Sequence, residues 1–262
     1  MSSTVTESAV SVVKCDIRPP IARIVLHNPP LNVISVPMMR RLAQTLAEIE
    51  ARPDVSVIVV SGDGRAFSVG VDVAAHTPDR FEEMLANFHA VIRAVVASTK
   101  VTIAAVHGHC LGGGAELAMV CDLAYTAESA SWGFPEIRLG CYPPVACAGL
   151  AALVGQKRAA ELILTGRTIG GAEAAAIGLA NRAVPEGQLA ALVDECIGNL
   201  LNLSAAALAV TKKALYAWDA THFDKGLARA EKIYFEELMK TADAHEGIRA
   251  FLEKREPEWI GK

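Results

Sequence analysis

The sequence predicts an α/β protein in which short buried strands alternate with amphipathic helices up to about residue 184, followed by helices alone. Residues 55–61 and 101–106 are short, nearly continuous apolar runs, the pattern of strands that are buried on both faces of a sheet. The segments between such runs carry apolar residues at helical spacing. From about residue 185 onward the strand pattern stops and only helical periodicity remains.

The first predicted element is a β-hairpin. Residues 10–15 and 21–26 are β-branched runs, and the segment Arg18-Pro19-Pro20 between them has the composition of a turn. After a loop rich in proline and asparagine, Ser35 before Val36-Pro37 indicates the start of a helix. The elements that follow are a helix over 38–51, a strand over 55–61, a loop over 62–72, a helix over 78–98, a strand over 101–106 and a helix that begins near residue 113.

The last part of the chain is expected to be helical. Stripes of apolar residues at helical spacing, separated by Lys and Glu, run over 189–201, 205–218, 223–241 and 244–254. These helices expose enough apolar surface that we expect them to pack against a neighbouring copy as well as against their own core. The sequence therefore predicts a homo-oligomer.

Composition and charge exclude several classes of protein. Of the 262 residues, 52% are hydrophobic and 21% are charged, which supports a sizeable core and argues against disorder. The net charge of −4 is unlike the basic surface of a nucleic-acid-binding protein. The sequence has no secretory signal pattern and no apolar run of 18 or more residues, so we expect neither secretion nor a membrane span. Six cysteines without a C-x-x-C pair indicate reduced thiols and a cytoplasmic protein.

The most informative stretch begins with the three glycines Gly112-Gly113-Gly114, which interrupt an apolar run and precede Glu116. Glycine lets backbone N–H groups come close to a ligand and adopts positive φ without steric cost. If a helix begins at Gly113, the free N–H groups of its first turn form a site for an oxygen that becomes anionic during a reaction. Taken alone, the triplet is also compatible with a tight turn, and Glu116 with a charge that the helix dipole favours.

A second carboxylate, Glu136, lies in the apolar segment WGFPEI at 132–137. Aromatic and aliphatic neighbours raise the pKa of a carboxyl group toward values that suit acid–base catalysis. Taken alone, Glu136 could be a solvated loop charge. Together with the glycine triplet and Glu116, it predicts proton transfer next to a carbonyl group.

Other possible sites have weaker support. Ser68 does not lie in a G-x-S-x-G motif, which argues against a serine hydrolase. His107 and His109 could chelate a metal ion but have no third ligand nearby in the sequence. The pair Gly62 and Gly64 lacks the third glycine of a dinucleotide-binding motif. We therefore expect no metal ion and no redox cofactor.

Three separated motifs resemble the crotonase (enoyl-CoA hydratase/isomerase) superfamily, and the resemblance extends over the whole chain. The motifs are FSVGVD at 67–72, GGGAELA at 112–118 and FPEIRLG at 134–140. The resemblance implies a spiral of repeated β-β-α units with the active site over residues 1–200, and a C-terminal helical trimerisation region over 201–262. It also implies assembly as a trimer or as a dimer of trimers.

The same resemblance implies chemistry on an acyl-CoA thioester. The backbone N–H groups of Val71 and Gly113 would form an oxyanion hole for the thioester carbonyl. Glu116 would position and activate a water molecule, and Glu136 would protonate the α-carbon of an enoyl-CoA. Coenzyme A is then part of the substrate, and no separate cofactor is needed. The residues expected to contact the substrate are Leu31, Ala66, Ser68, Val69, Asp72, Trp132, Tyr142 and Pro144. An isomerase of the same family and a non-catalytic binding protein with the same fold remain alternatives.

One loop departs from the family pattern. Typical hydratases of the family have a glycine-rich loop after the second glutamate, whereas this chain has CYPPVACA at 141–148. This loop, the segment 28–34 and Met38-Met39 resemble the cyclohexa-1,5-diene-1-carbonyl-CoA hydratases of aromatic compound degradation. Proline fixes φ and restricts the residue before it. A rigid, apolar wall of this kind predicts a compact cyclic acyl group in preference to a long flexible chain.

Overall fold

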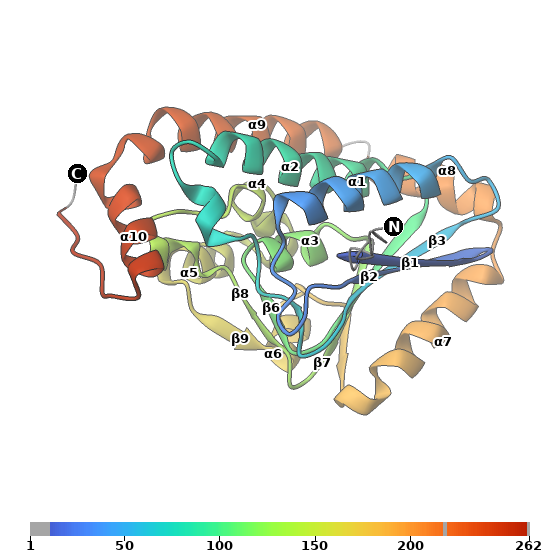
Figure 1. Ribbon diagram of the computed structural model, residues 1–262. Coiled ribbons are helices and arrows are strands. Elements are labelled where there is room, and N and C mark those ends of the chain that lie inside the picture. Colours follow the sequence, from blue (N-terminus) through green and yellow to red (C-terminus); the bar gives the residue numbers. More distant parts are fainter. Residues whose placement is uncertain (1–10, 217–218, 261–262) are drawn as a thin grey trace, which may run out of the picture.

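The computed structural model describes residues 11–216 and 219–260, and the side chains of all of these except 219–222. They form two β-sheets that are covered by helices (Figure 1). The six-stranded sheet has the order β1-β2-β3-β5-β7-β10 and is parallel except for the β1–β2 pair. The four-stranded sheet has the order β4-β6-β8-β9 and is parallel except for the β8–β9 pair.

The strands are β1 (Val13–Arg18), β2 (Ile21–Leu26), β3 (Val57–Gly62), β4 (Ala66–Ser68), β5 (Val101–Val106), β6 (His109–Leu111), β7 (Leu123–Ala127), β8 (Ser131–Gly133), β9 (Thr168–Gly170) and β10 (Arg182–Val184). The α-helices are α1 (Val36–Glu50), α2 (Phe81–Ala97), α3 (Gly113–Met119), α4 (Pro144–Val154), α5 (Gln156–Thr165), α6 (Gly171–Ala176), α7 (Leu189–Leu201), α8 (Ala205–Tyr216), α9 (Asp219–Glu236) and α10 (Ala242–Glu253). Short 3₁₀ helices are η1 (Val73–His76), η2 (Pro135–Leu139), η3 (Glu186–Gln188) and η4 (Leu238–Lys240).

Successive turns of the chain repeat a β-β-α unit. Strands β3, β5 and β7 lie side by side in the six-stranded sheet, and the strand that follows each of them lies in the four-stranded sheet. A helix then completes each turn: α2 after β4, α3 after β6, and α4 after β8. This is the spiral that the sequence resemblance implied, and the expected α/β class is confirmed.

The central strand β3 is buried on both faces, as its apolar run predicted. Ile58 and Val60 belong to the large core, which also contains the inner faces of α1 and α2. Val57 and Val59 belong to a smaller cluster on the other face, formed with α7. Both faces of the strand therefore contribute apolar burial to stability.

Two boundaries in the N-terminal half differ from the expected ones for local reasons. The hairpin turn consists of Pro19-Pro20 only, because Arg18 still pairs with Ile21. The helix expected from residue 78 begins at Phe81, because the backbone N–H groups of Arg80 and Phe81 both bond to the carbonyl of Thr77 and form a turn there.

The loop expected over 62–72 contains β4, a strand that the sequence analysis did not predict. A strand of three residues is too short to show a period. By contrast, α1 begins as predicted: Ser35 Oγ accepts a hydrogen bond from Met38 N at 3.5 Å, and Pro37 lies in the first turn.

The C-terminal part is helical, as predicted. The helix expected over 189–201 is α7, and the helix expected over 205–218 is α8, of which residues 217–218 lie outside the described residues. The segment expected as one helix over 223–241 is α9 followed by η4. Helix α9 packs along α4, and α10 packs on η1 and η2 (Figure 1). Helices α9 and α10 thus pack directly on elements of the β-β-α spiral.

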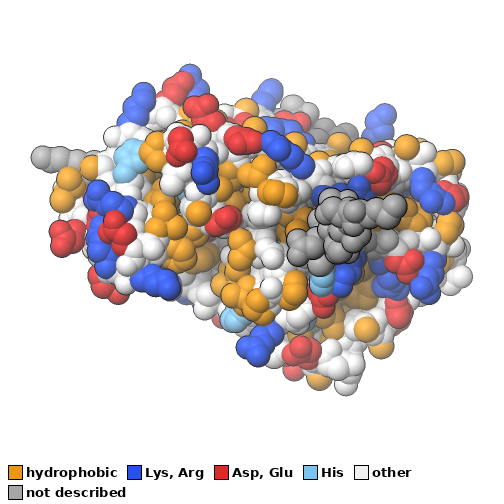
Figure 2. All heavy atoms as spheres, in the orientation of Figure 1, with side chains coloured by type: hydrophobic (Ala, Val, Ile, Leu, Met, Phe, Trp, Pro, Cys, Tyr) orange, Lys and Arg blue, Asp and Glu red, His pale blue; other side chains and the backbone are white. Residues whose placement is uncertain are grey.

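On the face in Figure 2, acidic and basic side chains are interspersed. Within the described ranges, no single helix is both long and apolar enough to cross a membrane. Only the pair Glu186–Leu201 and Ala205–Tyr216, which is bent by 104°, meets the length and composition criteria when taken together.

Candidate active site

Two backbone N–H groups reach the same pocket at the start of α3. Ile34 and Val71 form a parallel bridge, in which Ile34 N donates to Gly70 O and Asp72 N donates to Ile34 O. In a bridge of this kind the N–H of Val71 takes no part and lies on the side of the strand that faces away from Ile34. The N–H of Gly113 belongs to the first turn of α3 and has no acceptor within the helix. Val71 and Gly113 both line the pocket.

Glycine is required at this point because the two segments approach very closely. A Cβ added to Gly113 would lie 2.8 Å from Val71 Cγ2 and 3.4 Å from Val71 N. Gly70 has φ of +100°, and an added Cβ would lie 2.9 Å from the carbonyl oxygen of Leu111. The glycines therefore let two N–H donors converge on one small space, the geometry of an oxyanion hole.

Glu116, in the first turn of α3, is held by the N-terminus of another helix. Its side chain is buried, and Oε1 accepts hydrogen bonds from Val145 N at 2.8 Å and Ala146 N at 3.0 Å. These are the free donors of the first turn of α4, since Pro143 and Pro144 have no N–H. The prolines that stand out in the sequence thus begin a helix whose free N–H groups bind Glu116.

Glu136 lies in η2, directly opposite Gly112. A Cβ added to Gly112 would lie 2.6 Å from Glu136 Oε1, and Gly112 has φ of +52°. Glu136 Oε2 is buried and has no hydrogen-bond partner among the described residues. The two carboxylates therefore differ: Glu116 is hydrogen-bonded, whereas Glu136 keeps an oxygen unpaired beside the pocket.

Burial keeps protons on this pair of carboxyl groups. Desolvation raises the pKa of Glu116 to about 7, against the opposing effect of the N–H groups of Ala146 and Val145. Desolvation, followed by the nearby charge of Glu116, raises the pKa of Glu136 well above its usual range. Near neutral pH the pair therefore contains both a proton donor and a group that can accept a proton.

The pocket between these groups has a volume of about 80 Å³. Apart from the carboxylates and N–H groups, its wall is mainly apolar and is supplied by α2, the loop before α4, and α9. Met84, Leu85 and Phe88 come from α2, and Tyr234 comes from α9. A cavity of about 150 Å³ accommodates benzene, so this one is small.

The expected substrate contacts are only partly at the pocket. Val69, Tyr142 and Pro144 line it, together with the catalytic candidates Glu116 and Glu136 and the oxyanion-hole candidates Val71 and Gly113. Leu31, Ala66, Ser68, Asp72 and Trp132 do not line it.

Most of the expected residues that do not line the pocket take part in the packing and hydrogen bonding of the fold. Ser68 is fully buried, where Oγ donates to Asn32 O at 2.7 Å and accepts from Gly70 N at 3.0 Å. Trp132 is fully buried and donates to Thr126 Oγ1 at 3.0 Å, and the side chain of Asp72 caps η1. Ala66 is fully buried, whereas Leu31 is 38% exposed on its loop. The side chains of Ser68, Ala66 and Trp132 therefore do not line this pocket, and the contacts expected between these residues and the substrate stay predictions.

Sequence reasoning did not find most of the apolar wall, or the pocket residues His76 and Tyr234, whereas Cys141 belongs to the loop 141–148 that was expected to form the wall. Apolar residues on the inner face of a helix follow the same period whether they face a core or a cavity. No local signal therefore distinguished Phe88 or Tyr234 from an ordinary core residue. The two histidines His107 and His109 do not lie at this pocket, and the described residues contain no group of three or more potential metal ligands.

The site combines two buried carboxyl groups with two converging backbone N–H groups, an arrangement that suits acid–base chemistry next to a carbonyl group. The sequence profile of the enoyl-CoA hydratase/isomerase family matches residues 16–262. The chain therefore belongs to the enoyl-CoA hydratase/isomerase family and is an enzyme of that family.

Individual relatives cover nearly the whole chain. It is 36% identical over 239 residues to a cyclohexa-1,5-dienecarbonyl-CoA hydratase of Thauera aromatica, which covers 90% of this chain and 92% of that protein. It is 34% identical over 248 residues to a probable enoyl-CoA hydratase of Bacillus subtilis, with 92% and 96% covered. The crystal structure of an enoyl-CoA hydratase from Mycobacterium avium subsp. paratuberculosis matches with a TM-score of 0.87 at 29% identity, over 96% of this chain and 100% of that one.

Proposed function

We propose that this enzyme adds water reversibly to the double bond of a short enoyl-CoA thioester. The single observation that carries the proposal is the pair of buried carboxyl groups, Glu116 and Glu136, beside the converging N–H groups of Val71 and Gly113. The thioester carbonyl accepts hydrogen bonds from these two N–H groups. They stabilise the enolate that forms when the β-carbon gains an oxygen.

The surroundings of the two carboxyl groups suggest their roles. Glu116 accepts two N–H hydrogen bonds, which favour its ionised form, so it takes a proton from water as the water oxygen bonds to the β-carbon. Glu136 keeps one oxygen unpaired among the described residues, and burial raises its pKa well above its usual range, so it gives its proton to the α-carbon. The product is a 3-hydroxyacyl-CoA, and the net proton count of the pair is unchanged.

Loss of the conjugated thioester absorbance of crotonyl-CoA and related enoyl-CoA thioesters tests this proposal. The wild type should consume the conjugated substrate, whereas Glu116→Gln and Glu136→Gln should bind it without turnover. If Glu116→Gln turns the substrate over and only Glu136→Gln is inactive, a one-carboxylate isomerase explains the site better. If the wild type binds the thioesters but consumes none, the chain is a binding protein.

We further propose a compact cyclic dienoyl-CoA, such as cyclohexa-1,5-diene-1-carbonyl-CoA, as the preferred substrate. Two observations support this: the name of the relative from Thauera aromatica, and the two prolines at the wall of the pocket. A ring loses little conformational entropy on binding. Discrimination by pocket shape is typically about 10–200-fold, so kcat/KM for the cyclic dienoyl-CoA should exceed that for crotonyl-CoA by a factor in this range.

We also propose that the enzyme is a trimer or a dimer of trimers, assembled through its C-terminal region. Val210 and Leu215 on α8 are 69% and 67% exposed. Phe251, Leu252, Trp259 and Ile260 at the other end of this region are also exposed. Exposed apolar side chains that recur along one region are typical of an interface between subunits.

A further inference from the structure

Tyr234 carries a buried hydroxyl group that neither the fold nor the proposed reaction uses. The residue is 1% exposed and lines the catalytic pocket from α9. Its hydroxyl oxygen is buried and has no hydrogen-bond partner among the described residues. An unpaired buried hydroxyl group destabilises the folded state, so a tyrosine here needs an explanation that phenylalanine would not.

The neighbours of Tyr234 do not satisfy this hydroxyl. The thiol of Cys141 lies beside it and interacts with it, but sulfur is only a weak hydrogen-bond acceptor, and the thiol itself donates to Leu139 O at 3.6 Å. The adjacent Tyr142 is oriented edge-on, with ring centroids 5.2 Å apart, and its own hydroxyl donates to Ala230 O at 2.6 Å. Of these two pocket tyrosines, one is therefore paired with the backbone and the other is not.

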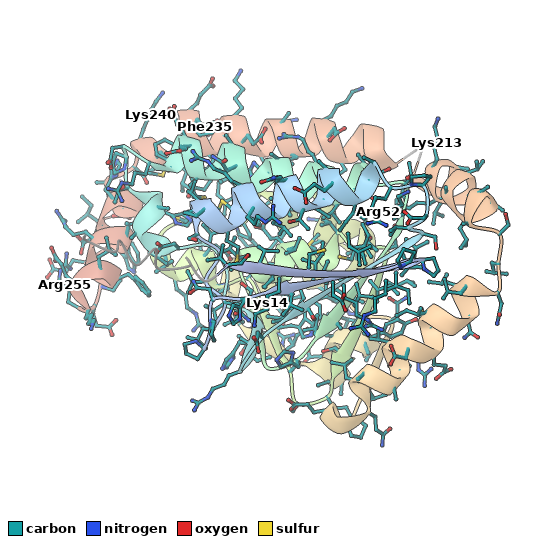
Figure 3. All side chains as sticks on the ribbon, turned by 45° about the vertical axis from the view of Figure 1, so that its right-hand side comes forward. Lys14, Arg52, Lys213, Phe235, Lys240 and Arg255 are labelled. Atoms are coloured by element: carbon teal, nitrogen blue, oxygen red, sulfur yellow. The ribbon has the colours of Figure 1, made fainter. Side chains whose placement is uncertain are left out.

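The ring of Tyr234 is fixed by aromatic packing, so the hydroxyl cannot turn away to find a partner. The ring centroid of Phe81, in α2, lies 6.3 Å from that of Tyr234 and 5.5 Å from that of Phe235. Phe235 lies where α9 runs along α2 (Figure 3). Burial and the neighbouring Cys141 thiol also raise the pKa of Tyr234, which keeps its hydroxyl protonated and able to donate.

We infer that the Tyr234 hydroxyl donates a hydrogen bond to an oxygen atom on the acyl group, so that between two acyclic enoyl-CoA thioesters of equal size the pocket favours the one that carries a hydroxyl group beyond the double bond. The inference rests on the proposed function for the position of the acyl group in this pocket. On the α2 side the pocket wall is apolar, formed by Met84, Leu85 and Phe88, so a methyl group in place of that hydroxyl gives the Tyr234 hydroxyl no acceptor there. A site built in this way discriminates by the missing hydrogen bond.

The test compares substrates that differ only by a hydroxyl or a methyl group at the same position. One pair is 4-hydroxybut-2-enoyl-CoA and pent-2-enoyl-CoA, and a second pair, one carbon longer, is 5-hydroxypent-2-enoyl-CoA and hex-2-enoyl-CoA. The measured quantity is kcat/KM for the hydroxylated member divided by kcat/KM for the methyl member. For at least one pair, this ratio should be about 10-fold or more higher in the wild type than in Tyr234→Phe. Tyr142→Phe is the matched control, because its hydroxyl is already paired with Ala230, and it should keep the wild-type ratio.

Equilibrium binding of the same four thioesters to the wild type and to Glu116→Gln, each with and without Tyr234→Phe, separates this inference from the proposed function. If no thioester is hydrated, the hydratase proposal fails and the ratios of Kd alone decide the role of Tyr234. Equal hydroxyl-to-methyl ratios before and after the Tyr234→Phe change, for both pairs, would overturn the inference. So would an equal loss for both members of a pair, because it would indicate a structural role or a role in the reaction itself.

Discussion

Glu116 Oε1 lies 2.8 Å from the backbone nitrogen of Val145, and this contact joins the first turns of two helices, α3 and α4. The carboxylate is therefore both a candidate base and the cap of α4, whose first free N–H groups are those of Val145 and Ala146 because Pro143 and Pro144 have none. The Glu116 side chain therefore has a proposed role in the reaction and a role in the stability of α4, and suitable substitutions can separate the two roles.

Replacing Glu116 by Gln or by Ala should have different effects on stability and the same effect on activity. Both changes remove the proton acceptor and should lower kcat for hydration by at least about 10²–10⁴-fold. Gln keeps an oxygen that can accept from Val145 and Ala146, whereas Ala leaves these N–H groups unpaired. Chemical denaturation should therefore show Glu116→Ala to be less stable than Glu116→Gln by about 1–2 kcal/mol. Equal stability of the two variants would contradict the capping role.

Gly112→Ala should disturb the second carboxylate. The added Cβ would lie 2.6 Å from Glu136 Oε1, at a residue with φ of +52°. Displacement of a catalytic group by about 1 Å can cost about 10²-fold in rate, and the strained backbone costs about 1–3 kcal/mol in stability. Gly198→Ala is the control, because this glycine lies within α7 with open space around its Cβ, and the change should leave activity intact. A fully active Gly112→Ala enzyme would show that Glu136 does not need its present position.

The pH profile of kcat/KM should be bell-shaped. Glu116 has a pKa of about 7 and must be ionised to accept a proton, so activity should rise as the pH increases through about 7. Glu136 has a pKa well above its usual range and must be protonated to donate, so activity should fall at higher pH. Initial rates between about pH 5 and 10 measure both limbs, which belong to the coupled pair. Activity that declines steadily from pH 5 would contradict these roles.

The C-terminal region should carry the contacts between subunits. Light scattering at micromolar concentration should give three or six times the chain mass of 27.7 kDa. Val210→Asp, on the exposed face of α8, should weaken the assembly, because it places a charge in an apolar interface. Leu164→Asp is the control, since Leu164 is 70% exposed on α5 and lies outside this region. A stable wild-type monomer would exclude this mode of assembly.

The sequence predicted the parts of the site that are local in the chain. Gly113 and Glu116 share one turn of helix, so their proximity follows from a motif of a few residues. The position of Glu136 beside Gly112 depends on the close approach of η2 to the start of α3, and sequence composition indicated only its apolar surroundings. In the sequence analysis, the segment of Glu136 was connected to the glycine triplet by the resemblance to a family and not by the spacing of residues along the chain.

The wall of the pocket could not be predicted in the same way. Tyr234 reaches the site only because α9 packs along α4 and α2, and its sequence neighbours give no sign of a catalytic pocket. Pro143 and Pro144 were recognised as unusual and interpreted as a rigid wall. Their consequence for Glu116, through the free N–H groups that follow them, depends on the direction in which α4 begins.

The measurement that tests the central claim most directly is the mass of the product formed from an enoyl-CoA in H₂¹⁸O. The account predicts that the wild type gives a 3-hydroxyacyl-CoA with one ¹⁸O atom from solvent, and that Glu116→Gln and Glu136→Gln give no such product. A product of unchanged mass with a shifted double bond would contradict hydration and establish isomerisation. Recovery of unchanged substrate, bound but not converted, would contradict catalysis of either kind on that thioester.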